Sequence, residues 1–126
     1  MSSITIMIFA SLAAGIGAVC RYKLDSFVAS KTNKSIPLGT ITVNVFACFL
    51  VGLTIPLCTS GAMSAVMSKI VSTGFLGGFS TFSTATIEGV RLLEERRTKD
   101  ALKHTLGMLI LSLLSCALGY ILSCSL

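Results

Sequence analysis

Four long runs of apolar residues, separated by short polar segments, constrain the fold of this chain more than any other feature. About 20 apolar residues suffice to cross the hydrocarbon core of a bilayer. Hydrophobic residues make up 53% of the 126 residues and charged residues only 12%. We therefore predict an all-α membrane protein with a single domain over residues 1–126. Its four transmembrane helices are expected at about 4–20, 38–58, 63–88 and 104–126.

The third run has an unusual composition for a membrane helix. Glycines lie at Gly74, Gly77 and Gly78, and hydroxyl residues follow at nearly consecutive positions up to Glu88. A tightly packed interfacial helix would explain the glycines and some of the hydroxyl residues, but it explains less well why polar side chains face several directions. Because lipid offers backbone groups no partners, an irregular backbone at this depth must be buried in protein or line a wet cavity. Glycine has low helix propensity, so we predict a helix break near Gly77-Gly78.

The polar groups inside the predicted spans suit an anion better than a cation. Cation and proton carriers normally need an acid inside the membrane, and only Glu88, towards one end, supplies one. Hydroxyl and amide groups can each donate a hydrogen to an anion, and the positive edges of Phe79 and Phe82 could face it. His104 is expected at a membrane interface without a metal. The candidate donors are Thr40, Asn44, Ser80, Thr81, Ser83, Thr84 and Ser112.

Positive charge is concentrated in two predicted loops, residues 21–37 and 91–103. Part of the first could be helical, and the second is expected to be a solvated helix end and loop. The two segments hold nine of the ten Lys and Arg residues, and Lys69 is the remaining one. The net charge of +5 could suggest nucleic acid, but basic residues between membrane helices are better explained by topology. By the positive-inside rule both loops are predicted to be cytoplasmic and both termini outside.

Three motifs resemble those of one known family. Residues 77–84 (GGFSTFST) resemble the GG-x-[ST]-T-F-S-[ST] signature of the small fluoride channels, the Fluc or CrcB family. Residues 39–44 (GTITVN) resemble its G-T-x-x-V-N at the start of the second helix. Residues 17–22 (GAVCRY) resemble its G-[AS]-x-x-R-[YFW] at the end of the first. Order, spacing and chain length agree over the whole chain, and the third-helix signature is the specific one.

The resemblance implies a dimer of antiparallel subunits in the cell membrane, with two narrow pores at the dimer interface. It implies passive, selective export of fluoride that lowers fluoride in the cytoplasm. It also implies a structural Na⁺, not transported, held by main-chain oxygens that match Gly77 and Ser80. The pathway residues matched by motif position, together with the donor Thr40, are Arg21, Thr40, Asn44, Phe82, Ser83, Thr84 and Ser112.

Two positions depart from the family pattern. The second phenylalanine expected three residues after Phe82 is Ala85, and a hydroxyl expected after Ser112 is Cys116, a weaker donor. A homodimer of antiparallel subunits needs a chain that inserts both ways, whereas the charge of this chain favours one orientation. We therefore hypothesise pairing with a paralogous subunit and loss of one pore at Ala85. A homodimer with modified pores remains the alternative.

Two other classes of membrane protein compete with a channel. A small proton-coupled drug exporter is also built from four short helices, but it relies on a carboxylate in its first helix, and residues 4–20 contain none. A non-conducting partner subunit of a heterodimeric channel would fit Ala85. An enzyme is not expected, because the sequence contains no nucleophile–base arrangement, phosphate loop or metal-ligand cluster.

Overall fold

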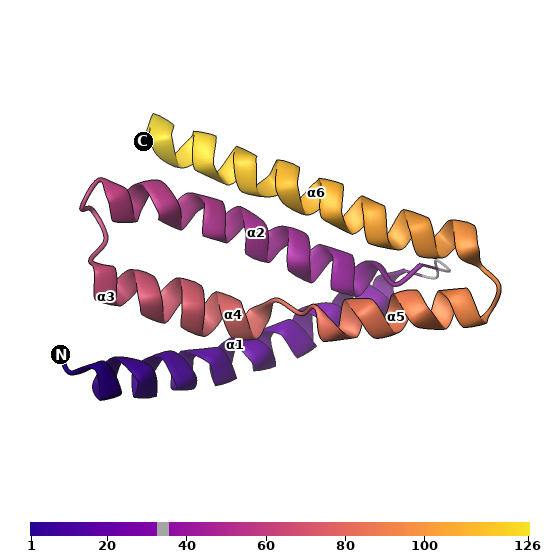
Figure 1. The fold of residues 1–126 in the computed structure, drawn as a ribbon, viewed down its shortest axis with the longest axis horizontal. Coiled ribbons are helices and arrows are strands. Elements are labelled where there is room, and N and C mark those ends of the chain that lie inside the picture. The colour runs from indigo at the N-terminus through magenta and orange to yellow at the C-terminus, as the bar shows by residue number, and fades with distance from the viewer. Residues whose placement is uncertain (33–35) are drawn as a thin grey trace.

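The protein is helical throughout its regular structure in a computed structural model that describes residues 1–32 and 36–126 (Figure 1). Helices α1, α2 and α6 are each long and apolar enough to cross a membrane. Between α2 and α6 lies a run of shorter helices, one of which, η1, is π-helical. The elements are α1 (Ser3–Lys31), α2 (Leu38–Thr59), α3 (Ala65–Ser68), η1 (Lys69–Leu76), α4 (Gly77–Phe79), α5 (Ser83–Glu94) and α6 (Thr98–Ser125).

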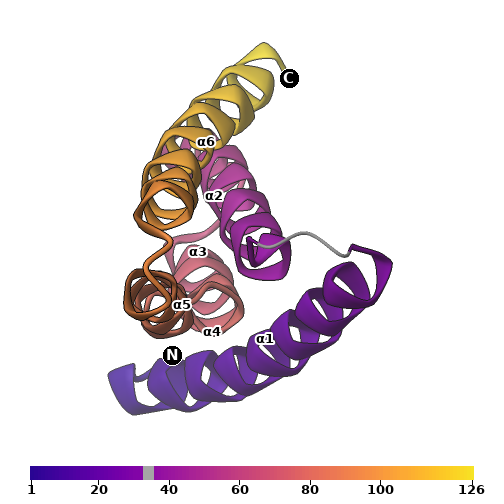
Figure 2. The ribbon, with the colours of Figure 1, turned by 90° about the vertical axis from the view of Figure 1, so that its right-hand side faces the viewer.

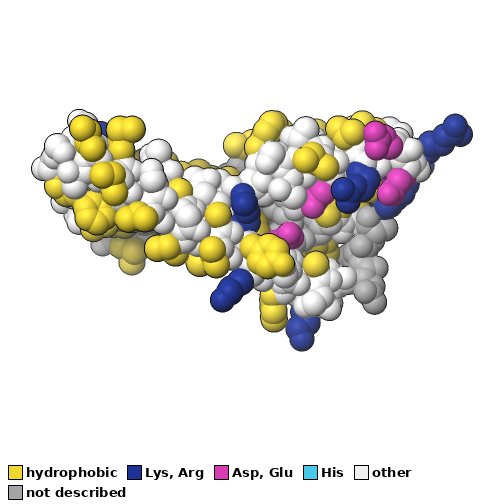
Figure 3. Space-filling model, turned by 90° about the horizontal axis from the view of Figure 1, so that it is seen from below, with side chains coloured by type: hydrophobic (Ala, Val, Ile, Leu, Met, Phe, Trp, Pro, Cys, Tyr) yellow, Lys and Arg dark blue, Asp and Glu magenta, His cyan; other side chains and the backbone are white. Residues whose placement is uncertain are grey.

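Both termini lie at the same end of the long axis of the molecule (Figure 1). The run of short helices from α3 to α5, between α2 and α6, is called the third pass here. The connection between α5 and α6 lies at the opposite end, which we call the loop end. In the view along the axis, α1 crosses one side of the other helices obliquely (Figure 2). Figure 3 shows charged side chains of both signs from the middle of the visible face to the loop end. The described parts of the two basic segments lie in this half of the fold, on different sides of it (Figures 1 and 2).

Two helices are longer than the predicted membrane segments. Helix α1 does not end at Cys20 but continues to Lys31, so residues 21–31, predicted as loop, are helical. No glycine or proline interrupts that stretch, and the helix ends where Thr32 adopts an extended backbone. Helix α6 likewise begins at Thr98 rather than at His104. Residues 33–35, part of the predicted polar connection, lie outside the described residues.

Glycines let α1 pack backbone to backbone against η1 and α4. A Cβ added to Gly17 would overlap the carbonyl oxygen of Phe75, and one added to Gly78 would overlap that of Ala14. The same is true between α2 and α6, where a Cβ on Gly119 would overlap the carbonyl oxygen of Phe49. Small residues at such crossings are typical of membrane helices, because they permit close van der Waals packing.

The buried core lies where α2 packs on α4. Val43, Ala47 and Phe79 form its centre. The ring of Phe79 stacks on Phe75, with centroids 6.0 Å apart, and meets Phe46 edge-on at 6.1 Å. Phe79 is therefore a core residue, and its ring edge is not available to an anion.

The third pass is broken, but not at the predicted position. Gly77 has helical dihedral angles and α4 includes both glycines, so the break does not lie at Gly77-Gly78. It falls at residues 80–82, where Ser80 is extended with ψ of 160°. Gly77-Gly78 instead belongs to the segment that packs on α1. The backbone leaves the helix only after these glycines, where a side chain of α2 can replace the helical hydrogen bonds of the backbone.

Candidate functional site

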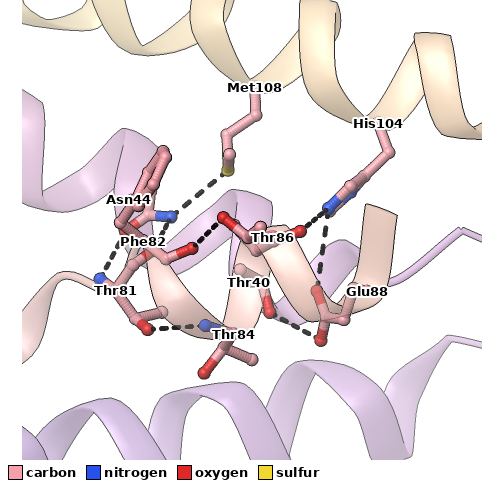
Figure 4. Close-up of polar contacts among 10 residues, drawn as sticks. Thr40, Asn44, Thr81, Phe82, Thr84, Thr86, Glu88, His104 and Met108 are labelled. Carbon is pink, nitrogen blue, oxygen red and sulfur yellow. Dashed lines mark hydrogen bonds and ion pairs between the residues drawn. The ribbon is translucent and has the colours of Figure 1, made fainter. Parts of the chain in front are cut away.

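The partner that permits the break is the side-chain amide of Asn44, on α2. Its Oδ1 accepts a hydrogen bond from the backbone N–H of Thr81 at 2.8 Å, and its Nδ2 donates to the carbonyl oxygen of Thr81 at 2.7 Å (Figure 4). Buried backbone groups that leave a helix need other partners. One side chain thus replaces both of the hydrogen bonds that Thr81 gives up by leaving the helix.

Hydroxyl groups complete the hydrogen bonding on the far side of the break. The Oγ1 of Thr81 accepts from the N–H of Thr84 at 3.3 Å, as a capping residue does at a helix start. The Oγ1 of Thr86 donates to the carbonyl oxygen of Phe82 at 2.8 Å. The hydroxyl groups of this segment therefore supply hydrogen bonds to the backbone where α5 begins, within an otherwise apolar protein.

Two hollows lie beside the break and share Thr81. The larger, of about 450 Å³, is bounded by α2, the break and α6; it is lined by Asn44, Cys48, Ser80, Thr81, Phe82, Thr105, Met108, Leu109 and Ser112. The smaller, of about 160 Å³, lies towards α1; it is lined by Arg21, Tyr22, Asp25, Thr40, Val43, Thr81 and Thr84.

The hollows divide the predicted pathway residues into two groups. Asn44, Phe82 and Ser112 line the larger hollow, whereas Arg21, Thr40 and Thr84 line the smaller one. Ser83 is exposed and lines neither. The structure thus brings together six of the seven residues around one break, but on two sides of it.

The two phenylalanines of the signature have opposite surroundings. Phe82 is 83% exposed, whereas Phe79 is only 4% exposed. Phe82 lies in the wall of a mostly apolar hollow, and burial of such a side chain is worth about 2–3 kcal/mol. Its ring therefore faces the surroundings of this chain, whether these are lipid or another protein.

The two carbonyl groups expected to hold Na⁺ flank the break. The usual helical partner of the Gly77 carbonyl is the N–H of Thr81, which donates to Asn44 instead. The Ser80 carbonyl oxygen accepts a long hydrogen bond, 3.4 Å, from a guanidinium nitrogen of Arg21. Carbonyl oxygens released by a helix break are ligands of the type that Na⁺ takes, but Arg21 places a positive charge beside one of them.

A second polar cluster was missed by the sequence interpretation. The Oε1 of Glu88 accepts from the Oγ1 of Thr40 at 2.9 Å, and Oε2 lies 3.8 Å from the Nε2 of His104. His104 is fully buried within the chain, and its expected place at a membrane interface stays a prediction. The available signal was Glu88 itself, the one acid within a predicted span, but nothing in the sequence indicated a histidine on α6 as its neighbour.

Comparison with known proteins gives a consistent result. A family model described as CrcB-like protein, Camphor Resistance (CrcB), matches residues 8–120. The fluoride-specific ion channel FluC 1 of Leifsonia xyli subsp. xyli is 39% identical over 90% of this chain and 83% of its own length. FluC 3 of Bifidobacterium longum is 38% identical, covering 90% and 94% of the two chains. A FluC of Thermus thermophilus is 36% identical, covering 87% of each.

Proposed function

Since this chain belongs to the CrcB family of membrane proteins, whose relatives are named as ion channels and not as enzymes, we propose that it forms a fluoride-selective channel. Fluoride leaves the cytoplasm through it passively, down the electrochemical gradient, and cytoplasmic fluoride falls. The relatives' names support fluoride as the permeant ion. The names give no support to the drug-exporter alternative.

One observation of the structure carries the proposal. Asn44, Phe82 and Ser112 converge on a hollow that is open at the side of the chain. Most of the wall is apolar, and its few polar groups come from residues such as Asn44, Thr81 and Ser112. Lipid offers such groups no partners, so we propose that another protein surface covers the hollow. A second subunit, placed antiparallel, would close the hollow into a narrow path between the two chains, with the exposed Phe82 ring at the seam.

The donors differ in how freely they can serve an anion. One Nδ2 hydrogen of Asn44 is held by the Thr81 carbonyl, and the same nitrogen contacts the sulfur of Met108 at 3.2 Å. A thioether is a weak acceptor, so a fluoride ion would compete with it successfully. Ser112 offers its hydroxyl from the facing helix. We infer that Asn44 both holds the break and presents one N–H to the path.

A structural Na⁺ belongs to this proposal as well. The carbonyl oxygens of Gly77 and Ser80 would hold it, with equivalent oxygens from the partner subunit. When bound, the ion supplies a fixed positive charge, which attracts anions strongly in a low-dielectric surrounding. The guanidinium of Arg21 lies beside the Ser80 carbonyl oxygen; it adds positive potential for an anion but repels the Na⁺ that this oxygen would hold.

The location and orientation follow from the charges. We propose that the chain lies in the cell membrane with residues 21–37 and 91–103 in the cytoplasm, since the described parts of both segments lie in the half of the fold nearest the loop end. A reporter enzyme that is active only in the cytoplasm tests this. It should be active when inserted between α5 and α6, and inactive when fused after Leu126; the reverse result contradicts the orientation.

A growth assay tests the function in cells. In a host that lacks its own fluoride export, the wild-type chain should restore growth in fluoride medium, and Ser112→Ala should restore it less. Ser125→Ala is the matched control, because the Ser125 hydroxyl donates only to its own helix, at Ile121. Failure of the wild-type chain, correctly inserted, to protect the host contradicts export by this chain alone.

Ala85 favours one variation on this proposal, in which a paralogous subunit completes the channel. The Ala85 side chain is 4% exposed and cannot offer a ring edge to the path. A heterodimer would then conduct through one pore, or this chain would serve as a non-conducting partner. Purified chain should show little efflux from liposomes alone and gain it with the paralogue. Full activity alone, with two conducting pores in each dimer, would rule this out and leave the homodimer.

A further inference from the structure

The pair formed by the partly buried Glu88 and the fully buried His104 is not used by the proposed fluoride path. His104 has no exposed surface, and its Nε2 lies 3.3 Å from the carbonyl oxygen of Ala85. That contact requires a hydrogen on Nε2, because a carbonyl oxygen only accepts. The Oε2 of Glu88 lies 3.8 Å from the same nitrogen (Figure 4).

Both members of the pair keep one polar atom without a partner. Within the part of the chain that the structure describes, the buried side-chain atoms that lack a hydrogen bond are Oε2 of Glu88 and Nδ1 of His104. An unpaired polar atom in an apolar surrounding is costly, and an unpaired charge more so. Protonation of His104 adds a hydrogen to Nδ1, which has no acceptor among the described residues, and buries a positive charge. The attraction of that charge to the unpaired carboxylate oxygen of Glu88 opposes this cost and lowers the cost for Glu88.

The pair is linked to the proposed path through its neighbours. Thr40 donates to Glu88 and also lines the smaller hollow. Thr84 lines the same hollow and lies four residues before Glu88, hence on the same face of α5. A change of charge on the pair therefore changes the electrostatic potential in the smaller hollow, at its end nearest the loop end.

The other charged groups around Glu88 do not change in the same pH range. Helix α1 contributes Asp25, with Arg21 in the same hollow, and α5 contributes Arg91. Helix α2 contributes the uncharged Thr40, and α6 contributes His104 itself. Aspartate and arginine keep their charges between about pH 5.5 and 8, whereas histidine ordinarily titrates within it.

We propose that Glu88 and His104 form a proton-binding pair that makes fluoride flux depend on the pH at the loop end. This inference rests on the proposed function. With His104 neutral, the carboxylate of Glu88 leaves a net negative charge beside the path, which repels fluoride. With His104 protonated, the pair is neutral overall, so fluoride passes faster at lower pH.

A spectroscopic experiment tests the pair without any flux. His104 is the single histidine of the chain, so the ring signals of ¹⁵N-histidine-labelled protein report it directly. In the full-length protein in detergent or lipid, we expect these signals to shift between about pH 5.5 and 8. In Glu88→Gln the midpoint should move by about half a pH unit or more. A ring that stays neutral to pH 5.5, or a midpoint unmoved in Glu88→Gln, overturns the pair.

A flux experiment then tests its effect. Fluoride efflux from proteoliposomes is measured at pH 5.5 and 7.5, with equal pH on both sides and the leak of protein-free liposomes subtracted. Wild type should be about threefold or more faster at pH 5.5, because one net charge is removed. His104→Gln and Glu88→Gln should lose the pH dependence. The exposed neighbour Lys103, changed to Gln, is the matched control and should keep it.

The outcomes separate this inference from the proposed function. Wild-type flux that is equal at both pH values overturns the proton-binding effect and leaves the channel intact. Fluoride flux that is absent at both pH values contradicts the proposed function, and the histidine spectra still decide whether the pair binds a proton. Where neither variant folds, the wild-type titration and flux decide between these results.

Discussion

Asn44 and Thr81, 37 residues apart in the sequence, are joined by two hydrogen bonds of 2.7 and 2.8 Å between one side-chain amide and the backbone of one residue. The contact joins α2 to the break in the third pass, between the two hollows that contain most of the proposed path. The hydroxyl-rich segment can leave the helix at this depth because Asn44 takes over the bonds that water would otherwise supply.

Asn44→Ala should destabilise the protein. It leaves the N–H and the carbonyl of Thr81 without their partner, and each unsatisfied buried group costs about 1–3 kcal/mol. Denaturation in detergent measures the change. Thr42→Ala, on the same helix, is the control, because the Thr42 hydroxyl bonds only to Leu38 of its own turn. Equal stability of the two variants would contradict the role given to Asn44.

Gly17→Ala should also destabilise, by about 1–3 kcal/mol or more, because its added methyl group overlaps the backbone of Phe75. The matched control is Gly15→Ala, two residues away on α1, where an added Cβ meets nothing within 4 Å. Alanine has the higher helix propensity, so Gly15→Ala should be neutral or slightly stabilising. The two thermal unfolding midpoints are compared; a result in the opposite order would mean that α1 does not pack on η1 and α4 as described.

Phe82→Ala and Phe79→Ala should fail in different ways. Phe82 is 83% exposed in this chain, so its loss should lower fluoride efflux about tenfold or more with little effect on folding of the monomer. The Phe79 side chain is in the core, and its loss should cost about 3–5 kcal/mol of stability. Efflux per folded protein and the unfolding midpoint are measured for both. Normal efflux in folded Phe82→Ala would remove that ring from the path.

Removal of sodium should weaken both structure and function. Protein purified without Na⁺, in a large organic cation, should unfold at a lower temperature, because binding to the folded state alone stabilises it by mass action. Efflux should fall in the same sample. Re-addition of Na⁺, but not of the same concentration of K⁺, should restore both. Identical melting and flux without Na⁺ would count against an ion held by Gly77 and Ser80.

Hydropathy predicts much of the fold because the signal is local. The long apolar runs around α2 and α6 contain few charges, and helices occupy both. The ends are less well predicted: the charged residues 21–31 read as a loop, yet they contain no helix-breaking residue, and α1 continues through them. The sequence therefore predicts the length of each apolar run better than the length of the helix that contains it.

The site was only partly predictable, because its decisive contacts join distant residues. The glycines suggested a break at Gly77-Gly78, but the break follows them, where Asn44 reaches the backbone of Thr81. Nothing local distinguishes Phe79 from Phe82, three residues apart, until the core on α2 takes one ring and leaves the other outside. His104 looked like an isolated polar residue, since its neighbours Glu88 and Ala85 come from another helix.

The most direct test of the account is halide efflux from liposomes that contain the purified protein, with the paralogous subunit added where one exists. Fluoride and chloride electrodes record the release of both ions from the same vesicles, loaded with equal concentrations. Rapid release of fluoride with retention of chloride is the predicted result. Release of neither ion by correctly folded protein, or of both at similar rates, would contradict a fluoride-selective path at the helix break.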